Sequence, residues 1–271
     1  MDNLTVISND VKQDLMSKQI EILDYIYDFC NNSNLRISLA YGTLLGAVRH
    51  KGYIPWDHDI DCMMPRKDFD IFCKSFPTEG RYFLQTNNTD ANFKWSFAKV
   101  RDSNTTFIEP FNVGKEMNQG IWVDIFPYDS VSEKKLIREL QYKTVVLKIK
   151  CMNPLNACGK SRKVMETIFA HKWVLSFLNK LNVILGGNSK CYADFSNNLE
   201  TSKKSLDNIF HEFIKLPFEG KEYKCISNYD YYLTKNYGDY MQIPSDHSLE
   251  NELEILARCI IDTKNGYKNY I

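Results

Sequence analysis

Three aspartates at alternating positions, Asp57, Asp59 and Asp61, open a stretch that continues with apolar residues. In a β-strand, residues i, i+2 and i+4 share one face, roughly 6–7 Å apart per step. Three like charges on one face of a sheet repel one another, and a divalent cation removes that repulsion. Mg²⁺ is typically held by one or two carboxylates together with phosphate oxygens. The row therefore indicates a metal site for phosphate chemistry.

Aspartate-rich runs also cap turns or bind Ca²⁺ in loops such as the EF-hand. Here the glycine and the glutamate of an EF-hand loop are missing, and Ile60 and residues 62–64 continue as apolar sheet residues. Pro55 suits the first position of a strand, where its missing N–H costs least. The spacing alone leaves the turn and the metal site equally open, and the surrounding residues favour the metal site.

The bulk composition sets broad limits on fold and location. A chain of 271 residues, 44% hydrophobic, can bury a core as one large domain or as a domain with a subdomain. Its 34 basic and 34 acidic residues argue neither for nor against nucleic acid. The N-terminus lacks the features of a signal peptide, and no run of 18 apolar residues exists. Eight scattered cysteines without a CxxC pair are expected to be reduced, so the sequence predicts a cytoplasmic protein.

Hydrophobic periodicity and turn residues predict the local elements. Thr43 is expected to cap the helix that begins after it, and Gly42 permits close backbone approach. A helix N-terminus beside the aspartates suits a phosphate. The predicted helices are 11–30, 44–49, 66–75, 133–150, 160–182, 229–236 and 248–262, and the predicted strands are 36–40, 82–85, 97–101, 105–108, 121–126, 213–218 and 221–226.

Asp124 is the only charge in the apolar segment 121–126. A carboxylate in such a strand is rarely left unpaired, so either a basic partner or a metal ion is expected. Lys99 and Arg101 alternate on their own strand. They are candidates for contact with substrate phosphates, although exposed edge positions explain them equally well.

The middle of the chain is strongly basic. Residues 133–180 contain 11 Lys and Arg against three Glu, a balance of 11 − 3 = +8 within a neutral protein. A basic helical pair with aromatic side chains can lie on an anionic membrane surface. An ordinary helical subdomain with a solvated basic face explains the pattern slightly better, and no recognition motif supports nucleic acid.

The segments Tyr41–His50 and Gly52–Asp61 closely resemble the LicD family, which includes bacterial phosphocholine transferases and, more distantly, fukutin-type ribitol-phosphate transferases. Residues 122–127, 218–220 and 237–241 match later marks of that family, so the resemblance covers about residues 12–245. The basic middle and the end after Pro244 match less well. The resemblance implies an α+β fold with a nucleotidyltransferase-like mixed sheet, flanking helices and an inserted helical subdomain. The expected divisions are a catalytic core at 1–132, a basic helical insertion at 133–200 and a C-terminal part at 201–271 that completes the catalytic domain.

The resemblance also implies roles for individual residues. Asp59 and Asp61 should bind Mg²⁺, or Mn²⁺, with Asp124 as the third ligand. Asp57 is expected to bind metal, orient water or hold a base, and His58, pointing the other way, to support the structure. The residues expected to contact substrate are Gly42, Thr43, Arg49, His50, Trp56, Lys99 and Arg101.

The expected reaction moves phosphocholine from CDP-choline to a hydroxyl of a cell-surface glycan precursor and releases CMP. The acceptor is expected to be lipid-linked, which would bring the protein to the inner face of the membrane. Alternatives are transfer of ribitol phosphate, glycerol phosphate or a nucleotidyl group. A non-enzymatic alternative is a glycan- or membrane-binding module on a retired transferase fold.

Overall fold

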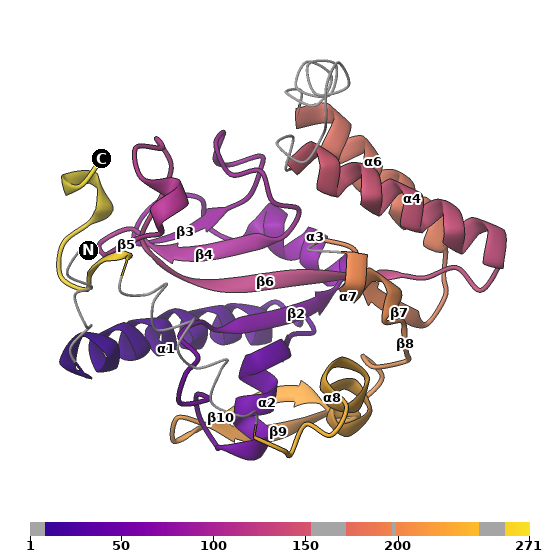
Figure 1. Ribbon diagram of the computed structural model, residues 1–271, viewed down its shortest axis with the longest axis horizontal. Helices are drawn as coiled ribbons and strands as arrows, with labels where there is room; N and C mark the ends of the chain where they lie inside the picture. The colour runs from indigo at the N-terminus through magenta and orange to yellow at the C-terminus, as the bar shows by residue number, and fades with distance from the viewer. Residues whose placement is uncertain (1–8, 153–171, 197–198, 244–257) are drawn as a thin grey trace, which may run out of the picture.

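A mixed sheet of seven strands forms the centre of the computed structural model, which describes residues 9–152, 172–196, 199–243 and 258–271. The strand order is β1-β2-β6-β4-β3, and β7 and β8 extend the sheet from the far part of β6 (Figure 1). Strands β2 and β6 are parallel and the other pairs are antiparallel. The strands are β1 (Ser38–Leu39), β2 (Asp61–Pro65), β3 (Tyr82–Gln85), β4 (Ala98–Asp102), β6 (Ile121–Ser130), β7 (Cys191–Asp194) and β8 (Leu206–Asp207).

Strand β6 organises this sheet. Its ten residues are buried except the last, as expected for a strand rich in β-branched and aromatic side chains. β2 pairs along one edge, while β4 and then β7 pair along the other. Asp124 therefore has Asp61 as its register partner on one side and Lys99 on the other.

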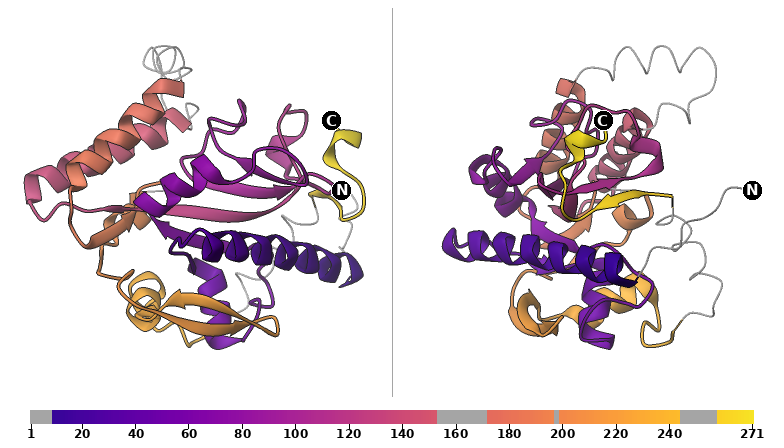
Figure 2. Two further views of the ribbon diagram at one scale, coloured as in Figure 1. Left: turned by 180° about the vertical axis from the view of Figure 1, so that it is seen from behind. Right: turned by 90° about the vertical axis from the view of Figure 1, so that its left-hand side faces the viewer.

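Seven α-helices of the described residues surround the sheet. α1 packs along the sheet, and its Phe29 ring meets Phe72 and Phe76 near the end of α3 at centroid distances of 5.6 and 5.0 Å. α4 and α6 lie side by side at one end of the molecule (Figures 1 and 2). The helices are α1 (Asn9–Asn32), α2 (Tyr41–Arg49), α3 (Arg66–Ser75), α4 (Lys135–Met152), α6 (Lys172–Gly186), α7 (Leu199–Lys203) and α8 (Tyr229–Tyr237).

Two small ribbons complete the fold. β9 (Phe213–Phe218) and β10 (Lys221–Ile226), both predicted as strands, form an antiparallel hairpin. α8 ends at Tyr237 and is capped by Gly238, whose φ of 69° suits glycine. β5 (Thr106–Ile108) pairs with β11 (Ile260–Asp262). The predicted final helix, 248–262, is therefore wrong at its end, because backbone pairing with β5 outweighs the local helical pattern; residues 244–257 lie outside the described part.

Most predicted elements before residue 150 are confirmed within one or two residues, including the mixed sheet and its flanking helices. The predicted helix 160–182 is described only from Lys172 onward. The three-part division of the chain stays a prediction, although β7, from the predicted insertion, joins the central sheet. Cys30, Cys62, Cys73, Cys191 and Cys225 have free thiols, as predicted.

Candidate metal and phosphate site

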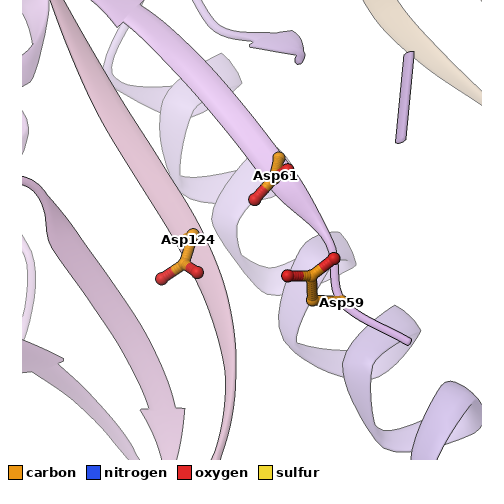
Figure 3. Close-up of side chains that lie close together, drawn as sticks. All are labelled: Asp59, Asp61 and Asp124. Atoms are coloured by element: carbon orange, nitrogen blue, oxygen red, sulfur yellow. The ribbon is translucent and has the colours of Figure 1, made fainter. Parts of the chain in front are cut away.

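Three carboxylates converge where β2 begins. Asp61 is the first residue of β2 and lies opposite Asp124 in the parallel register with β6, while Asp59 comes from the loop before β2 (Figure 3). One oxygen from each carboxylate lies within 4.8 Å of the other two. Among the described residues, this is the one group of three or more Asp, Glu, His or Cys side chains that close together.

The predicted aspartate strand is wrong in its extent. Residues 55–60 are not strand, so Asp57 and Asp59 reach the site from a loop and Pro55 lies in a turn. The chain bends there because the backbone N–H of Asp57 donates to the carbonyl of Ile54. The carboxylates are brought together by this turn and by the β2–β6 pairing, rather than by alternation along one strand.

The cluster is electrostatically strained without a cation. Burial, followed by the nearby charges of Asp59 and Asp124, raises the pKa of Asp61 well above its ordinary value. Burial also raises the pKa of Asp124, although the ammonium of Lys99 opposes that shift. Such carboxylates gain most from a bound cation, because it favours the charged form that burial penalises.

Asp124 has a basic partner, one of the two alternatives that the sequence left open. Lys99 Nζ donates to its Oδ2 at 3.0 Å, and the indole N–H of Trp122 donates to the same oxygen at 3.1 Å. Its Oδ1 lies 2.8 Å from Lys99 Nζ, but it is buried and accepts no hydrogen bond in the described part of the chain. The Lys99 ammonium also lies 4.1 Å from the centre of the Trp122 ring. A basic partner therefore orients Asp124, and one carboxylate oxygen is left without a hydrogen bond from the described residues.

The start of α2 borders the same site. The prediction that Thr43 caps this helix is wrong, because α2 begins at Tyr41. Thr43 Oγ1 instead accepts the backbone N–H of Asp61 at 2.8 Å. Thr43 is therefore a positioning residue for β2. A Cβ at Gly42 would lie 2.5 Å from Oδ2 of Asp57, so any other residue would displace that carboxylate from its present position.

A cleft of about 510 Å³ contains the cluster. Its apolar lining comes from six aromatic side chains, and its charged lining includes all four predicted aspartates and Lys99. The lining residues that the sequence did not single out are Tyr41, Trp95, Phe97, Glu109, Phe111, Phe126, Thr201 and Tyr237. They come from separate elements, and no spacing pattern in the sequence connects them.

His58 is also among the residues that line the cleft, although the sequence predicted that it points the other way. The loop conformation of residues 55–60 removes the strand alternation on which that prediction rested. Its Nδ1 is buried without a hydrogen bond to the described residues, and its ring lies 6.3 Å from that of Phe107.

Five residues predicted to contact substrate do not line this cleft, namely Thr43, described above, and Arg49, His50, Trp56 and Arg101. Arg49 donates to the carbonyls of Tyr240 and Gln242 at the far end of α2. His50 and Trp56 pack against each other with ring centroids 6.2 Å apart. Arg101 is neither at the cleft nor at an exposed edge; it is fully buried and donates to Gln85 and to the carbonyl of Gly120.

This chain is similar in sequence to a known protein family and to one of its members. The domain described as LicD/FKTN/FKRP, nucleotidyltransferase domain matches residues 34–158, which contain β2, β6 and the carboxylate cluster. The lipopolysaccharide cholinephosphotransferase LicD of Haemophilus influenzae is 30% identical over 251 residues, covering 84% of this chain and 90% of that protein. The chain therefore belongs to the LicD family.

Proposed function

We propose that this protein transfers phosphocholine from CDP-choline to a hydroxyl of a cell-surface glycan precursor, in a metal-dependent reaction that releases CMP. The observation that carries the proposal is the cluster of Asp59, Asp61 and Asp124 within an aromatic cleft. The similar Haemophilus influenzae protein is named a lipopolysaccharide cholinephosphotransferase, which supports choline as the alcohol and lipopolysaccharide as the acceptor. Teichoic acid and capsule precursors are the other acceptors we consider.

The residues present fit Mg²⁺ or Mn²⁺. All three side chains are carboxylates, the donors these hard cations prefer, and a buried oxygen of Asp124 lacks a hydrogen bond among the described residues. Asp59, Asp61 and Asp124 would hold the ion, which when bound supplies charge neutralisation for the donor's phosphates. Lys99 adds a further positive charge beside Asp124 and keeps this carboxylate oriented.

In this reaction one bond forms, one bond breaks and one protein base accepts the proton. The acceptor oxygen forms a bond to the phosphorus that bears choline, and the bond from that phosphorus to the oxygen of CMP breaks. We assign the hydroxyl proton to Asp57, because it lines the cleft outside the three-carboxylate cluster. Asp124 suits this role less well, since both of its oxygens lie beside Lys99.

The cleft walls favour choline over a polyol. A trimethylammonium group is cationic and apolar at once, and it binds best against aromatic faces. Phe111, 61% exposed at the cleft, and the neighbouring Glu109 provide an aromatic face and a negative charge together. Ribitol or glycerol would instead need a wall of hydrogen-bonding groups for its hydroxyls.

The helices α4 and α6 support peripheral contact with a membrane that carries the acceptor. No helix in the described ranges is long and apolar enough to cross a membrane. On α4, the exposed Lys135 and Lys143 accompany Leu136 and Leu140, whose exposed fractions are 86% and 46%. Basic and apolar side chains on one helix suit the surface of an anionic leaflet, here the cytoplasmic one. Unchanged binding to anionic vesicles after Lys135→Gln and Lys143→Gln would contradict this contact.

The test is CMP release from the purified protein with Mg²⁺ and, separately, CDP-choline, CDP-ribitol and CDP-glycerol. Each donor is assayed with and without a bacterial glycan acceptor. We expect CMP from CDP-choline, loss of that activity in Asp59→Asn, and no loss in Asp14→Asn, a matched exposed control on α1. In Phe111→Leu, the preference for CDP-choline over CDP-glycerol should fall by roughly two- to fivefold, the worth of an exposed cation–π contact.

Other outcomes point to the alternatives. Nucleotide found on the acceptor would indicate nucleotidyl transfer, and CMP from another donor would change the alcohol. Glycan binding without turnover of any donor would favour the binding-module alternative.

A further inference from the structure

A second hollow, about 520 Å³ in volume, opens beside the carboxylate cleft. It lies between α3, the loop 86–89 and α6, and Trp95 and Phe97 line both spaces. Each space is as large as a typical small-molecule site, roughly 300–1,000 Å³. A transferase has to bring two substrates to one reacting atom, so a pair of adjoining spaces with a shared wall matches its needs.

Amide side chains are among the polar groups that line the second hollow. Within loop 86–89, the two threonine hydroxyls lie 3.1 Å apart, and Thr89 Oγ1 donates to the carbonyl of Leu84. These bonds hold the loop in place, while the side-chain amides of Asn87 and Asn88 bond to no described residue. An amide offers both donors and an acceptor, which matches sugar hydroxyls.

Apolar surface also lines this hollow. The rings of Trp95 and Phe97 are 5.7 Å apart and inclined by 30°, and Trp95 is half-buried. From α6, Val183 and Ile184 expose 37% and 75% of their surface. Sugar rings present apolar C–H faces between hydroxyl edges, so aromatic and aliphatic walls beside free amides suit them better than either kind of wall alone.

The charges of the hollow favour a neutral or anionic ligand. Arg66 bonds Asp129 through two nitrogens and also lies 3.6 Å from Asp70, so these three charges sum to −1. Lys74 and Lys180 also line the hollow and form no salt bridge with a described residue. Phosphate groups on a glycan would complement these two lysines.

We infer that this hollow binds the sugar residues of the glycan acceptor, so that its hydroxyl reaches the cleft past Trp95 and Phe97. The inference deepens the proposed function and rests on it. Cytidine, which could also stack on an aromatic ring, is the competing occupant. The acceptor is favoured because attack and departure at phosphorus are roughly in line, which calls for separate approaches for the acceptor and the leaving CMP.

The test combines direct binding with kinetics. Core oligosaccharide released from Haemophilus influenzae lipopolysaccharide is titrated into the metal-free protein, and CMP is titrated separately. The variants are Asn87→Ala with Asn88→Ala, and Ser176→Trp, which fills the hollow from a half-buried position on α6. Asn188→Ala, in the exposed turn after α6, is the control.

We expect the double alanine variant to weaken oligosaccharide binding, and to raise the acceptor KM, by about tenfold, as loss of two hydrogen bonds implies. Ser176→Trp should abolish oligosaccharide binding. The KM for CDP-choline should change less than twofold in both variants.

Loss of CMP binding in place of oligosaccharide binding would overturn the inference in favour of the nucleoside. Unchanged values for both ligands, or no oligosaccharide binding by the parent protein, would overturn it as well. Failure of the proposed function looks different, because the parent would then release no CMP from CDP-choline whatever the state of the hollow.

Discussion

Strand β6 carries two buried aspartates, five residues apart, that have opposite surroundings. Asp129 accepts two hydrogen bonds from Arg66, from Nε at 2.6 Å and from a terminal nitrogen at 2.9 Å, one on each oxygen. Asp124 instead accepts both of its hydrogen bonds on Oδ2, and its Oδ1 accepts none from a described residue. Its side chain belongs to a cluster that contains two further carboxylates.

This difference separates a structural carboxylate from a candidate ligand on the same strand. A bidentate arginine uses both oxygens of its partner and leaves no place for a ligand. A lysine is a point charge that orients a carboxylate and leaves part of it available. Burial alone therefore does not mark a functional aspartate; an incomplete set of partners beside like charges does.

The largest expected effect is on stability, at the arginine pair. Asp129→Asn leaves the Arg66 guanidinium buried without its counter-charge, so the free energy of unfolding should fall by about 3–5 kcal/mol. Urea denaturation measures this, and the KM for CDP-choline should stay near the parent value. A loss under about 1 kcal/mol would erase the contrast between the two aspartates.

Asp61→Asn should lower activity and leave stability unchanged, the reverse of Asp129→Asn. We expect CMP release to fall roughly a hundredfold to a thousandfold, as for loss of one charge-stabilising group. The metal-free variant should melt no lower than the parent, because the change removes one of several repelling charges. Asp14→Asn serves as the exposed control. A clear fall in melting temperature without loss of activity would make Asp61 structural.

Lys99→Met should lower the free energy of unfolding of the metal-free protein by about 1–3 kcal/mol. Among the described residues, the change leaves the buried Asp124 with only the Trp122 hydrogen bond. Added Mg²⁺ should restore most of this loss, because a cation replaces the missing ammonium. Thermal melts with and without Mg²⁺ measure both effects. Equal losses in the two conditions would mean that no cation binds beside Asp124.

The smallest expected effect is the change with pH in how strongly Mg²⁺ stabilises the protein. Because the pKa of Asp61 is raised in the folded protein, its contribution to stability is present at low pH and is lost as pH rises through the folded value. The rise in melting temperature on adding Mg²⁺ should therefore be larger at pH 8 than at pH 5.5. The affinity for the metal should rise by up to about tenfold for each unit increase in pH and each proton displaced. A pH-independent rise would contradict proton displacement at the cluster.

The local elements could be predicted where one face of a segment is strongly apolar. Helices α1 and α3, the hairpin β9–β10 and the strand β6 follow from periodicity and turn residues within the segment itself. The predictions failed where distant pairing decides, as at β11, or where a turn interrupts an alternating pattern, as before Asp61.

The sequence by itself determined the family resemblance, the four aspartates and the neighbouring glycine turn, because these lie within short stretches whose residue types limit the chemistry. Only the tertiary structure decided that Arg101 is buried, that Lys99 holds Asp124, and that Phe111 and Trp95 stand at the cleft. These contacts join strands and loops far apart in the chain. Their geometry depends on sheet register and helix packing, which no local spacing records.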